Sequence, residues 1–349
     1  MINAVMDIGI PKVKNYIFLV TGSAGFIGFH VARALLEHGA RVVGLDNYND
    51  YYSPALKHDR DLELRRYPNF ISIAGDLADL AVLETLFREH RPQKICHLAA
   101  QAGVRYSLVN PFAYQKANLE GFLNILELAK RFKVERLVYA SSSSVYGGLT
   151  ELPFAETQRV DTPISLYAAT KRANELMAHA YSHLFGLPTV GLRFFTVYGP
   201  WGRPDMAMWL FTQAMLKGEP IQVFNYGRMQ RDFTYIDDIV QGVLAALMVP
   251  GLEPYEIINL GNHRAENLPR VIGLLEEELQ VQAIQDLQPI QPGDVPATFA
   301  DISRAQARLN FQPATPIEVG IPRFVRWFLD YHHLNRPQAK IPVNKQRTL

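Results

Sequence analysis

Residues 20–28, VTGSAGFIG, place a glycine at every third position directly after a short apolar run. The run has the composition of a buried strand, and residues 26–38 repeat their apolar positions with a helical period. In a strand–turn–helix unit of this kind, Gly22 allows the tight turn and Gly28 allows the helix to pack closely on the sheet. Gly25 allows a pyrophosphate to approach the backbone at the positive end of the helix. The segment therefore predicts a dinucleotide site at the start of an α/β fold.

The alternation of strand and helix continues far along the chain. Short runs rich in β-branched and apolar residues alternate with longer helical stretches, such as 111–133, up to about Thr196. Strands that are apolar on both faces and are separated by helices predict a Rossmann-type doubly wound parallel sheet. The predicted strands are residues 16–22, 41–47, 70–76, 94–100, 135–142 and 188–195.

After Thr196 the rhythm changes, and we expect a second, smaller lobe. Residues 197–233 are rich in Gly, Pro, Trp and Met, and helical stretches return at 268–279 and 316–332. We predict a dinucleotide-binding Rossmann domain at 14–196 to which 234–260 contributes elements, a C-terminal α/β substrate lobe made of 197–233 and 261–335, and a mobile tail at 336–349.

Charge and cysteine content exclude several classes of protein. With 48% apolar residues, 20% charged residues and a net charge of +1, the chain has no electrostatic footprint for nucleic acid or an anionic membrane. Cys96 is the single cysteine and lies in an apolar strand, so we expect a buried, inert thiol and a reducing compartment. The N-terminal residues fit neither a signal peptide nor a membrane span, and we expect a cytoplasmic protein.

Acidic residues follow the next two predicted strands. Asp46 and Asn47 end the second strand at the spacing where a carboxylate hydrogen-bonds a ribose 2′-hydroxyl. A carboxylate there repels a 2′-phosphate, which favours NAD over NADP, although Asp46 also fits a simple turn. Asp76 has two readings as well, a contact to the adenine amino group or the N-cap of the next helix.

A candidate base lies further along. SLYAATK places Tyr167 and Lys171 four residues apart on one helix face. A nearby ammonium lowers the pKa of a phenol from about 10 toward neutrality, which creates a base for a hydroxyl proton. YASSSSVYGG runs from a strand into four serines, whose hydroxyls are expected at the ligand crevice. The Tyr–Lys pair alone is commonly a surface pair, and a serine run alone is commonly a loop. Both follow the glycine-rich segment in the chain, at positions that are consistent with one site.

The motifs TGSAGFIG, YASSSSVYG, YAATK and RFFTVYGP together resemble the extended short-chain dehydrogenase/reductase family, the nucleotide-sugar epimerases and dehydratases, over residues 15–335. The resemblance implies that NAD stays bound and is recycled. It also implies that Tyr167 acts as base, that Lys171 supports it and anchors the nicotinamide ribose, and that Ser142 binds the sugar 4-hydroxyl. Phe195 would lie near the nicotinamide. Further implied cofactor contacts are Phe26, Ile27, Leu77, Leu98, Ala99 and Ala100.

The serine run also separates reactions within this family. Members that eliminate water carry an acidic pair after the hydroxyl residue, and the UDP-glucuronate decarboxylases have a Glu just before VYG. Here those positions are Ser143 and Ser144, which are not general acids or bases near neutral pH. Elimination is therefore disfavoured, and oxidation at C4, rotation of the 4-keto sugar and return of the hydride remain.

Longer stretches, among them DNYNDYY, RFFTVYGPWGRPDMA, MQRDFTYIDDI and QPGDVPATFADI, resemble the UDP-glucuronate 4-epimerases. Thr196 stands where galactose-type epimerases have Asn, and with Arg203 it is a candidate for binding a C6 carboxylate. Arg105 is a candidate substrate or phosphate contact. Arg231 and Asp294 resemble the family's diphosphate and uridine-ribose contacts. Each of these charged residues also fits a turn or the solvated surface.

Other functions remain open. A UDP-hexose or UDP-N-acetylhexosamine 4-epimerase would use the same base and cofactor, a UDP-glucuronate decarboxylase is less favoured, and an NAD-sensing binding module ranks low because the catalytic residues are present. The residues His30, His38 and His97 lack metal-ligand spacing, so we predict no metal. The resemblance implies a UDP-sugar as substrate and a homodimer formed through helices 111–133 and 165–185, although burial within the monomer also explains the apolar residues of these helices.

Overall fold

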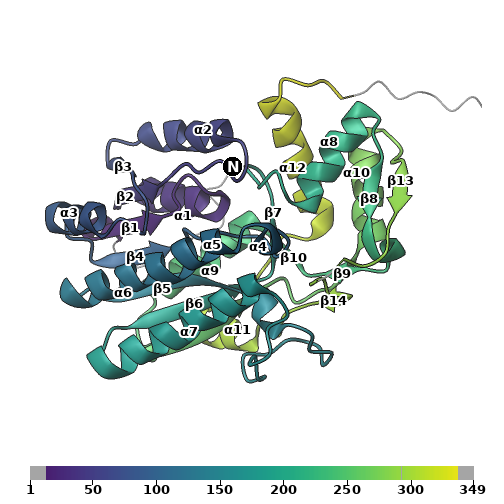
Figure 1. Ribbon diagram of the computed structural model, residues 1–349. Coiled ribbons are helices and arrows are strands. Elements are labelled where there is room, and N and C mark those ends of the chain that lie inside the picture. Colours follow the sequence, from purple (N-terminus) through teal and green to yellow (C-terminus); the bar gives the residue numbers. More distant parts are fainter. Residues whose placement is uncertain (1–12, 292, 337–349) are drawn as a thin grey trace, which may run out of the picture.

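A parallel sheet forms the centre of the protein (Figure 1). The structure is a computed structural model that describes residues 13–291 and 293–336. Within these residues the central sheet has seven strands in the order β11-β6-β5-β4-β1-β2-β3, all pairs being parallel. The predicted doubly wound sheet is confirmed. The strands are β1 (Ile17–Thr21), β2 (Arg41–Asp46), β3 (Phe70–Ala74), β4 (Lys94–His97), β5 (Arg136–Ser142), β6 (Thr189–Phe194) and β11 (Tyr255–Leu260).

Successive residues of each strand enter two different apolar clusters, one on each face of the sheet. Phe18 and Val20 of β1 join the cluster that contains α1 and α9, whereas Leu19 joins the cluster that contains α3, α6 and α7. This is the physical reason why the strands are apolar at every position. The helices around the sheet are α1 (Phe26–Glu37), α2 (Pro54–Arg65), α3 (Leu80–His90), α6 (Gly121–Arg131), α7 (Leu166–Phe185), α9 (Ile236–Met248) and α11 (Ser303–Leu309).

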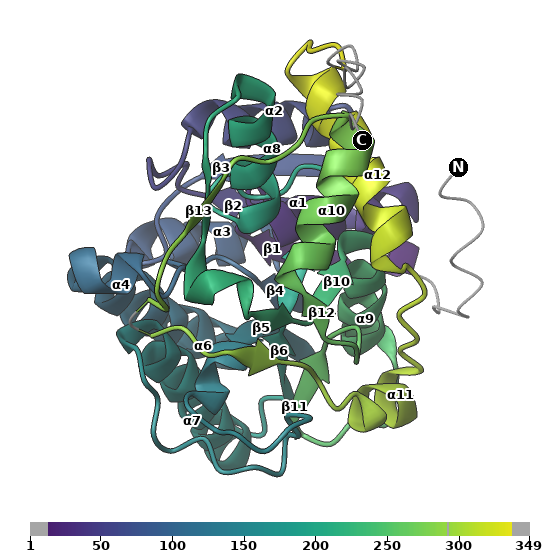
Figure 2. The ribbon, with the colours of Figure 1, turned by 90° about the vertical axis from the view of Figure 1, so that its right-hand side faces the viewer.

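Residues that follow β6 build most of a lobe beside the sheet, in which α8, α10 and α12 lie together (Figure 2). The indole of Trp209 on α8 packs against Trp327 and Phe328 of α12. The use of these parts for nucleotide and for substrate stays a prediction. The elements are β7 (Thr196–Tyr198), α8 (Ala207–Lys217), β8 (Ile221–Val223), η4 (Phe224–Gly227), β9 (Gln230–Arg231), β10 (Phe233–Tyr235), β12 (Glu266–Asn267), α10 (Leu268–Leu279), β13 (Gln285–Leu287), β14 (Ala297–Thr298) and α12 (Ile317–Tyr331).

The helix expected at 111–133 is interrupted. It divides into α5 (Pro111–Tyr114), the π-helical segment η2 (Gln115–Glu120) and α6, and it is preceded by the short helix α4 (Tyr106–Val109). Residues 337–349, nearly all of the expected mobile tail 336–349, and residues 1–12 lie outside the described part. In the described part, no helix combines the length and apolar character that crossing a membrane requires.

Candidate active site

A cavity of about 1270 Å³ opens at the carboxyl ends of the central strands. Ligands bind at this edge of open α/β sheets, next to the point where the strand order reverses. Every site residue that the sequence predicts lines this cavity, and the role of each stays a prediction. They are Gly22, Gly25, Phe26, Ile27, Gly28, Asp46, Asn47, Asp76, Leu77, Leu98, Ala99, Ala100, Arg105, Ser142, Ser143, Ser144, Tyr167, Lys171, Phe195, Thr196, Arg203, Arg231 and Asp294.

The glycine-rich turn leaves no room for side chains. Gly22 has a φ of +71°, and a Cβ atom built on it would lie 2.7 Å from the backbone nitrogen of Ala99. A Cβ atom on Gly28 would lie 2.0 Å from the carbonyl oxygen of Gly22. Gly25 is the N-cap of α1 and has no side chain to hydrogen-bond the first N–H groups of the helix. These N–H groups and the positive end of the helix dipole fit a pyrophosphate.

Asp46 lies beside this turn at the end of β2. Its Oδ2 accepts a hydrogen bond from the Ala24 N–H at 3.1 Å, and its Oδ1 accepts one from the Tyr48 N–H at 2.9 Å. Asp46 therefore serves as a turn residue and also ties the glycine-rich turn to β2. Burial raises the pKa of Asp46. Lys57 is a buried cation in the same wall of the cavity that the sequence reading missed, because no motif marks it.

Asp76 is not an N-cap. The N-cap of α3 is Asp79, whose carboxylate accepts from the backbone N–H groups of the first turn. Asp76 accepts from the Ala78 N–H at 2.9 Å and forms an ion pair with the Lys116 Nζ at 3.1 Å. The N-cap interpretation is wrong, since the chain extends three residues beyond Asp76 before the helix begins, and the adenine contact stays a prediction.

Tyr167 and Lys171 lie one turn apart at the start of α7. The hydroxyl of Ser165 accepts from the Ala168 N–H at 3.1 Å and thereby fixes where this helix begins. Lys171 is buried, and its Nζ donates to the carbonyl oxygen of Ala140 on β5 at 2.9 Å. Burial lowers the pKa of Lys171 to about 8. The ammonium is therefore anchored on the strand that leads to the serines.

The pKa of Tyr167 is shifted in the direction opposite to the expected one. Burial raises the pKa of Tyr167, and the Ser142 hydroxyl and the Arg203 guanidinium oppose this rise. The expected lowering of the Tyr167 pKa is wrong for this structure, because burial outweighs the groups that favour the phenolate, and Lys171 is not among those groups. The groups that favour the phenolate are thus a serine and an arginine distant in sequence.

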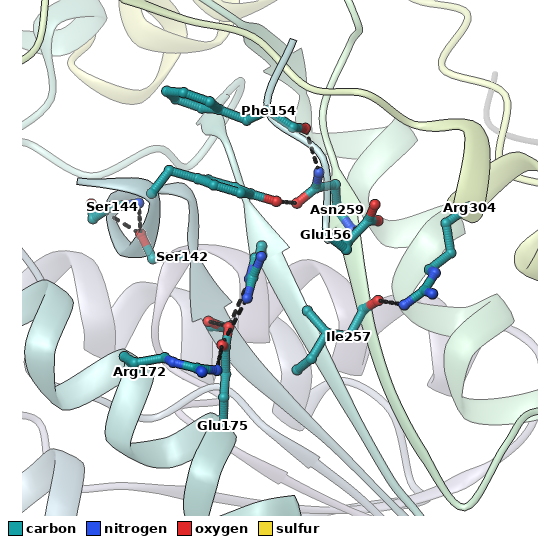
Figure 3. A network of polar contacts seen from close by, with 12 residues as sticks. Ser142, Ser144, Phe154, Glu156, Arg172, Glu175, Ile257, Asn259 and Arg304 are labelled. Carbon is teal, nitrogen blue, oxygen red and sulfur yellow. Dashed lines mark hydrogen bonds and ion pairs between the residues drawn. The ribbon is translucent and has the colours of Figure 1, made fainter. Parts of the chain in front are cut away.

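The serine run bends into a compact turn where β5 ends. The Ser142 Oγ accepts from the Ser144 N–H at 3.1 Å and lies 3.1 Å from the Ser144 hydroxyl (Figure 3). Ser142 thereby caps the 3₁₀ turn η3 (Ser143–Tyr146). As a result three neighbouring hydroxyls reach one wall of the cavity.

A buried ion pair stands behind the catalytic candidates. Glu175, two turns after Tyr167 on α7, is fully buried and accepts from the Arg193 guanidinium on β6 at 2.8 and 2.9 Å. The Ser141 hydroxyl donates to the same carboxylate at 2.6 Å, and Arg172 approaches at 3.1 Å (Figure 3). One carboxylate therefore joins α7, β5 and β6. The sequence reading missed this cluster because its members stand in three separate segments.

The π-helical segment η2 carries another residue that the sequence reading missed. The Asn118 Oδ1 accepts from the Gln101 N–H at 2.8 Å, and its Nδ2 donates to the Thr170 hydroxyl at 3.0 Å. Gln101 lines the cavity after β4, and Thr170 precedes Lys171 on α7. Asn118 therefore links the cofactor side of the cavity to the helix of the candidate base. Such π turns often occur at functional sites.

Thr196 and Arg203 line the lobe side of the same cavity. Arg203 is ion-paired: its Nε donates to the Asp205 Oδ1 at 3.0 Å and its Nη2 to Oδ2 at 2.5 Å. The Tyr51 hydroxyl donates to the Asp205 Oδ2 at 2.9 Å. Asp205 and Tyr51 were not singled out from the sequence, although GRPDMA and DNYNDYY contain them.

Charged residues from both halves of the chain meet at the far end of the cavity. The Arg105 Nη2 lies 3.3 Å from the Asp294 Oδ2, and the Arg105 guanidinium lies 4.8 Å from the centre of the Phe224 ring. Burial lowers the pKa of Arg231 beside them, and Asp294 and Arg105 act on it in opposite directions. Two guanidinium groups and one carboxylate leave a positive balance, which fits a diphosphate.

The residues expected to be inert have structural contacts. Cys96 is a free, buried cysteine, and burial raises the pKa of its thiol. Among the predicted structural histidines, His97 is hydrogen-bonded to the Thr21 hydroxyl at 2.8 Å, His30 to the carbonyl of Pro200 and His38 to a backbone carbonyl of its own helix. Within the described residues, no group of three or more His, Cys, Asp and Glu side chains is placed to hold a metal ion.

Comparisons with known proteins agree on one family. Residues 18–261 match the model of the NAD dependent epimerase/dehydratase family. The chain is 51% identical over 321 residues to an uncharacterised protein of Methanocaldococcus jannaschii, with 91% of this chain and 97% of that protein covered. It is 48% identical over 337 residues to UDP-glucuronate 4-epimerase 4 of Arabidopsis thaliana, with 92% of this chain and 77% of the relative covered.

A solved structure extends the likeness to the whole fold. The crystal structure of UDP-glucuronic acid 4-epimerase from Bacillus cereus, in complex with UDP-glucuronic acid and NAD, is similar with a TM-score of 0.85 and 34% identity. The similarity covers 90% of this chain and 99% of that chain. The predicted cofactor NAD is confirmed by the family. The chain, whose glycine-rich turn and Tyr–Lys pair share one cavity, belongs to the NAD dependent epimerase/dehydratase family.

Proposed function

We propose that the chain interconverts UDP-glucuronate and UDP-galacturonate by inverting C4 of the sugar. The observation that carries the proposal is one cavity lined by the Tyr167 phenol, the serine run at 142–144 and the Arg203 guanidinium. A phenol and serines fit a sugar hydroxyl, and a guanidinium fits a carboxylate. The names of the relatives and the solved complex with UDP-glucuronic acid and NAD support the same substrate.

The glycine-rich turn, Asp46 and Lys171 are the residues that would hold NAD. The turn receives the pyrophosphate, Asp46 a ribose hydroxyl and Lys171 the nicotinamide ribose. When bound, NAD supplies the acceptor for the C4 hydride and returns it. The chain itself orients the sugar, moves the hydroxyl proton and excludes water.

Tyr167 takes the proton of the 4-hydroxyl and gives it back when the sugar is reduced again. Because burial disfavours the phenolate, the Ser142 hydroxyl and the Arg203 guanidinium are needed to stabilise it. Ser142 also holds the 4-oxygen, with its Oγ positioned by the Ser144 N–H. Proton transfer by a positioned side chain contributes roughly 10²–10⁴-fold to the rate of such reactions.

The C6 carboxylate has to be protected during the reaction. Oxidation at C4 makes a β-keto acid, which loses carbon dioxide when the C5–C6 bond aligns with the carbonyl π system. Ser143, Ser144 and Thr196 hold the carboxylate away from this alignment, and Arg203 offsets its charge. A hydroxyl group is no acid near neutral pH, so these residues do not protonate C5.

The second candidate function is a UDP-hexose or UDP-N-acetylhexosamine 4-epimerase. The pairing of Arg203 with Asp205 is compatible with it, because Asp205 offsets part of the guanidinium charge and a neutral C6 group is then tolerated. The serines at 143 and 144 disfavour a UDP-glucuronate decarboxylase. An NAD-sensing module without catalysis is ranked lowest, since the Tyr–Lys pair lines the cavity.

We further infer a homodimer that works in the cytoplasm. Helices α6 and α7 lie side by side (Figure 1), and large apolar side chains are exposed on them and on the neighbouring α4 and α5. Large apolar side chains exposed on neighbouring helices fit an interface, and two helices per subunit suit a four-helix contact. Sedimentation is expected to give a dimer, and Leu176→Glu a monomer. The exposed residues are Leu108, Val109, Phe112, Leu123, Leu166, Leu176, Leu184 and Phe185.

Incubation of the purified protein with UDP-glucuronate, without added reductant, tests the proposal. Separation of the nucleotide sugars is expected to show UDP-galacturonate, with no net change in bound NAD. Tyr167→Phe, which removes only the phenolic oxygen, is the matched control and should be inactive with its NAD retained. Conversion of UDP-glucose instead supports the second candidate, and release of UDP-xylose or a 4-keto product refutes both.

A further inference from the structure

The guanidinium that would meet the substrate carboxylate already has a carboxylate partner. Arg203 donates to Asp205 through Nε at 3.0 Å and through Nη2 at 2.5 Å, and both residues line the cavity. The Tyr51 hydroxyl donates to the same Asp205 Oδ2 at 2.9 Å, and its ring lies 5.9 Å from the guanidinium. Tyr51 in turn packs on Tyr106, with ring centres 4.8 Å apart. Asp205 is therefore held from two sides.

The pairing with Asp205 determines which N–H groups of Arg203 remain available to a ligand. A guanidinium carries five N–H groups, and Asp205 takes the edge formed by Nε and one hydrogen of Nη2. Nη1 forms no hydrogen bond with any residue in the described part of the chain. One Nη1 hydrogen and the second Nη2 hydrogen form another two-donor edge, which matches a second carboxylate.

The pairing also decides how much charge the substrate meets. Burial raises the pKa of Asp205, but the Arg203 charge and the hydrogen bonds from Arg203 and Tyr51 outweigh it and hold the pKa below its ordinary value. Asp205 is thus ionised at neutral pH and offsets part of the charge of Arg203. A uronate carboxylate at the free edge would be bound by hydrogen bonds while a second anion repels it across the guanidinium.

Weak binding of the C6 carboxylate by Arg203 would help this reaction. Inversion at C4 requires the oxidised sugar to turn over inside the cavity, so the contacts of its C6 carboxylate must break and form again. A full, uncompensated ion pair in a part-buried site would slow this turn, because it stabilises the bound orientation but not the transition between orientations, in which the contact is broken.

We propose that Asp205 is a positioning and specificity-determining residue, which presents the outer edge of Arg203 to the substrate carboxylate and weakens its hold so that the sugar can turn. The inference rests on the proposed function. It assigns Asp205 a role through Arg203, not a contact with the reacting atoms.

Two substitutions of Asp205 separate its effect on the orientation of Arg203 from the effect of its own negative charge. Asp205→Asn keeps an oxygen acceptor for Arg203 and removes the negative charge. The KM for UDP-glucuronate is expected to fall by about tenfold while kcat falls by a similar factor. Asp205→Ala removes the acceptor as well, and KM should rise by about tenfold or more because the guanidinium loses its orientation. Tyr51→Phe should show a smaller effect in the direction of Asp205→Ala.

The experiment measures kcat and KM for UDP-glucuronate and calorimetric binding of UDP-glucuronate and UDP-glucose, all on NAD-loaded protein. Binding of UDP-glucose should hardly change in Asp205→Asn. Asp330→Asn, an exposed position on α12 away from the cavity, is the charge-matched control. Thermal unfolding verifies that each variant is folded.

The results distinguish the two levels of the proposal. If Asp205→Asn raises KM, leaves both constants unchanged or alters the binding of both nucleotide sugars equally, the role of Asp205 is overturned and the proposed function stands. If the wild-type protein does not convert UDP-glucuronate, the proposed function fails and this inference fails with it.

Discussion

Gly28→Ala tests whether the glycine-rich turn is limited by backbone packing. Gly28 lies inside α1, where alanine by itself is favoured over glycine by roughly 0.5–1 kcal/mol. The added Cβ atom would, however, lie 2.0 Å from the Gly22 carbonyl oxygen and 2.7 Å from its carbon, so the turn and the helix must separate. Overpacking of this kind costs roughly 1–3 kcal/mol or more. We therefore expect a net loss of about 2 kcal/mol in the free energy of unfolding, together with loss of bound NAD.

The matched control is Gly273→Ala in α10, where an added Cβ atom meets nothing within 4 Å. Here only the helix preference acts, and we expect a gain of roughly 0.5–1 kcal/mol. Urea unfolding of nucleotide-free samples, checked by their absorbance at 260 nm, gives both values. A Gly28→Ala protein as stable as the wild type would refute the steric reasoning.

Three further predictions concern buried charges. Lys171→Met should abolish turnover yet stabilise the nucleotide-free protein by about 2 kcal/mol at pH 7. Burial lowers the lysine pKa to about 8 from about 10.4, so holding the charged lysine in the folded protein costs about 3 kcal/mol, which methionine avoids. The hydrogen bond to Ala140 that methionine loses contributes about 1 kcal/mol in the opposite direction. Between pH 8 and about 10.4 the unfolded wild-type chain binds more protons than the folded one, so wild-type stability rises with pH and the advantage of the variant should shrink; an advantage that grows with pH would contradict the assignment. Glu175→Ala should cost about 3–5 kcal/mol in urea unfolding because it leaves the Arg193 charge buried and unpaired, whereas the double variant Glu175→Ala, Arg193→Met should recover part of the loss. Arg60→Met should lower the affinity for both NAD and substrate. The buried Arg60 guanidinium donates to the Ala24 carbonyl of the glycine-rich turn at 2.8 Å, and it also donates to the Trp201 and Gly202 carbonyls beside Arg203. Unchanged affinities in a folded variant would argue against this coupling.

The predictions that the structure confirms came from patterns among neighbouring residues. The alternation of apolar runs and helical periods, and the glycines after the first run, are properties of neighbouring residues, so they predict strands, a turn and the order of elements. The side of the sheet to which ligands bind follows from that order. This is why residues from separate motifs, such as Gly25 and Tyr167, were expected at one cavity and line it.

Where several local solutions compete, the sequence pattern was insufficient. The segment 76–79, DLAD, offers two carboxylates for one helix start, and the second of them caps α3. The apolar period of 111–133 does not reveal the π-helical turn, because one additional residue in a turn hardly alters the pattern. In the structure, Asn118 of the π-helical turn hydrogen-bonds Gln101, which follows β4, and Thr170 of α7.

The amino-acid sequence by itself determined the fold class, the nucleotide-binding turn and the candidate base. The fold class depends on the order of apolar runs and helical periods along the chain, and the turn and the candidate base depend on spacing within one short segment. Only the tertiary structure decided the partners of the charged groups: Tyr51 meets Asp205 across 154 residues, and Arg105 meets Asp294 across 189. It also decided the direction of the pKa shift of Tyr167, where burial outweighs the serine and the arginine that oppose it. Burial and charge separation depend on how distant segments pack, and a linear pattern contains no distances between them.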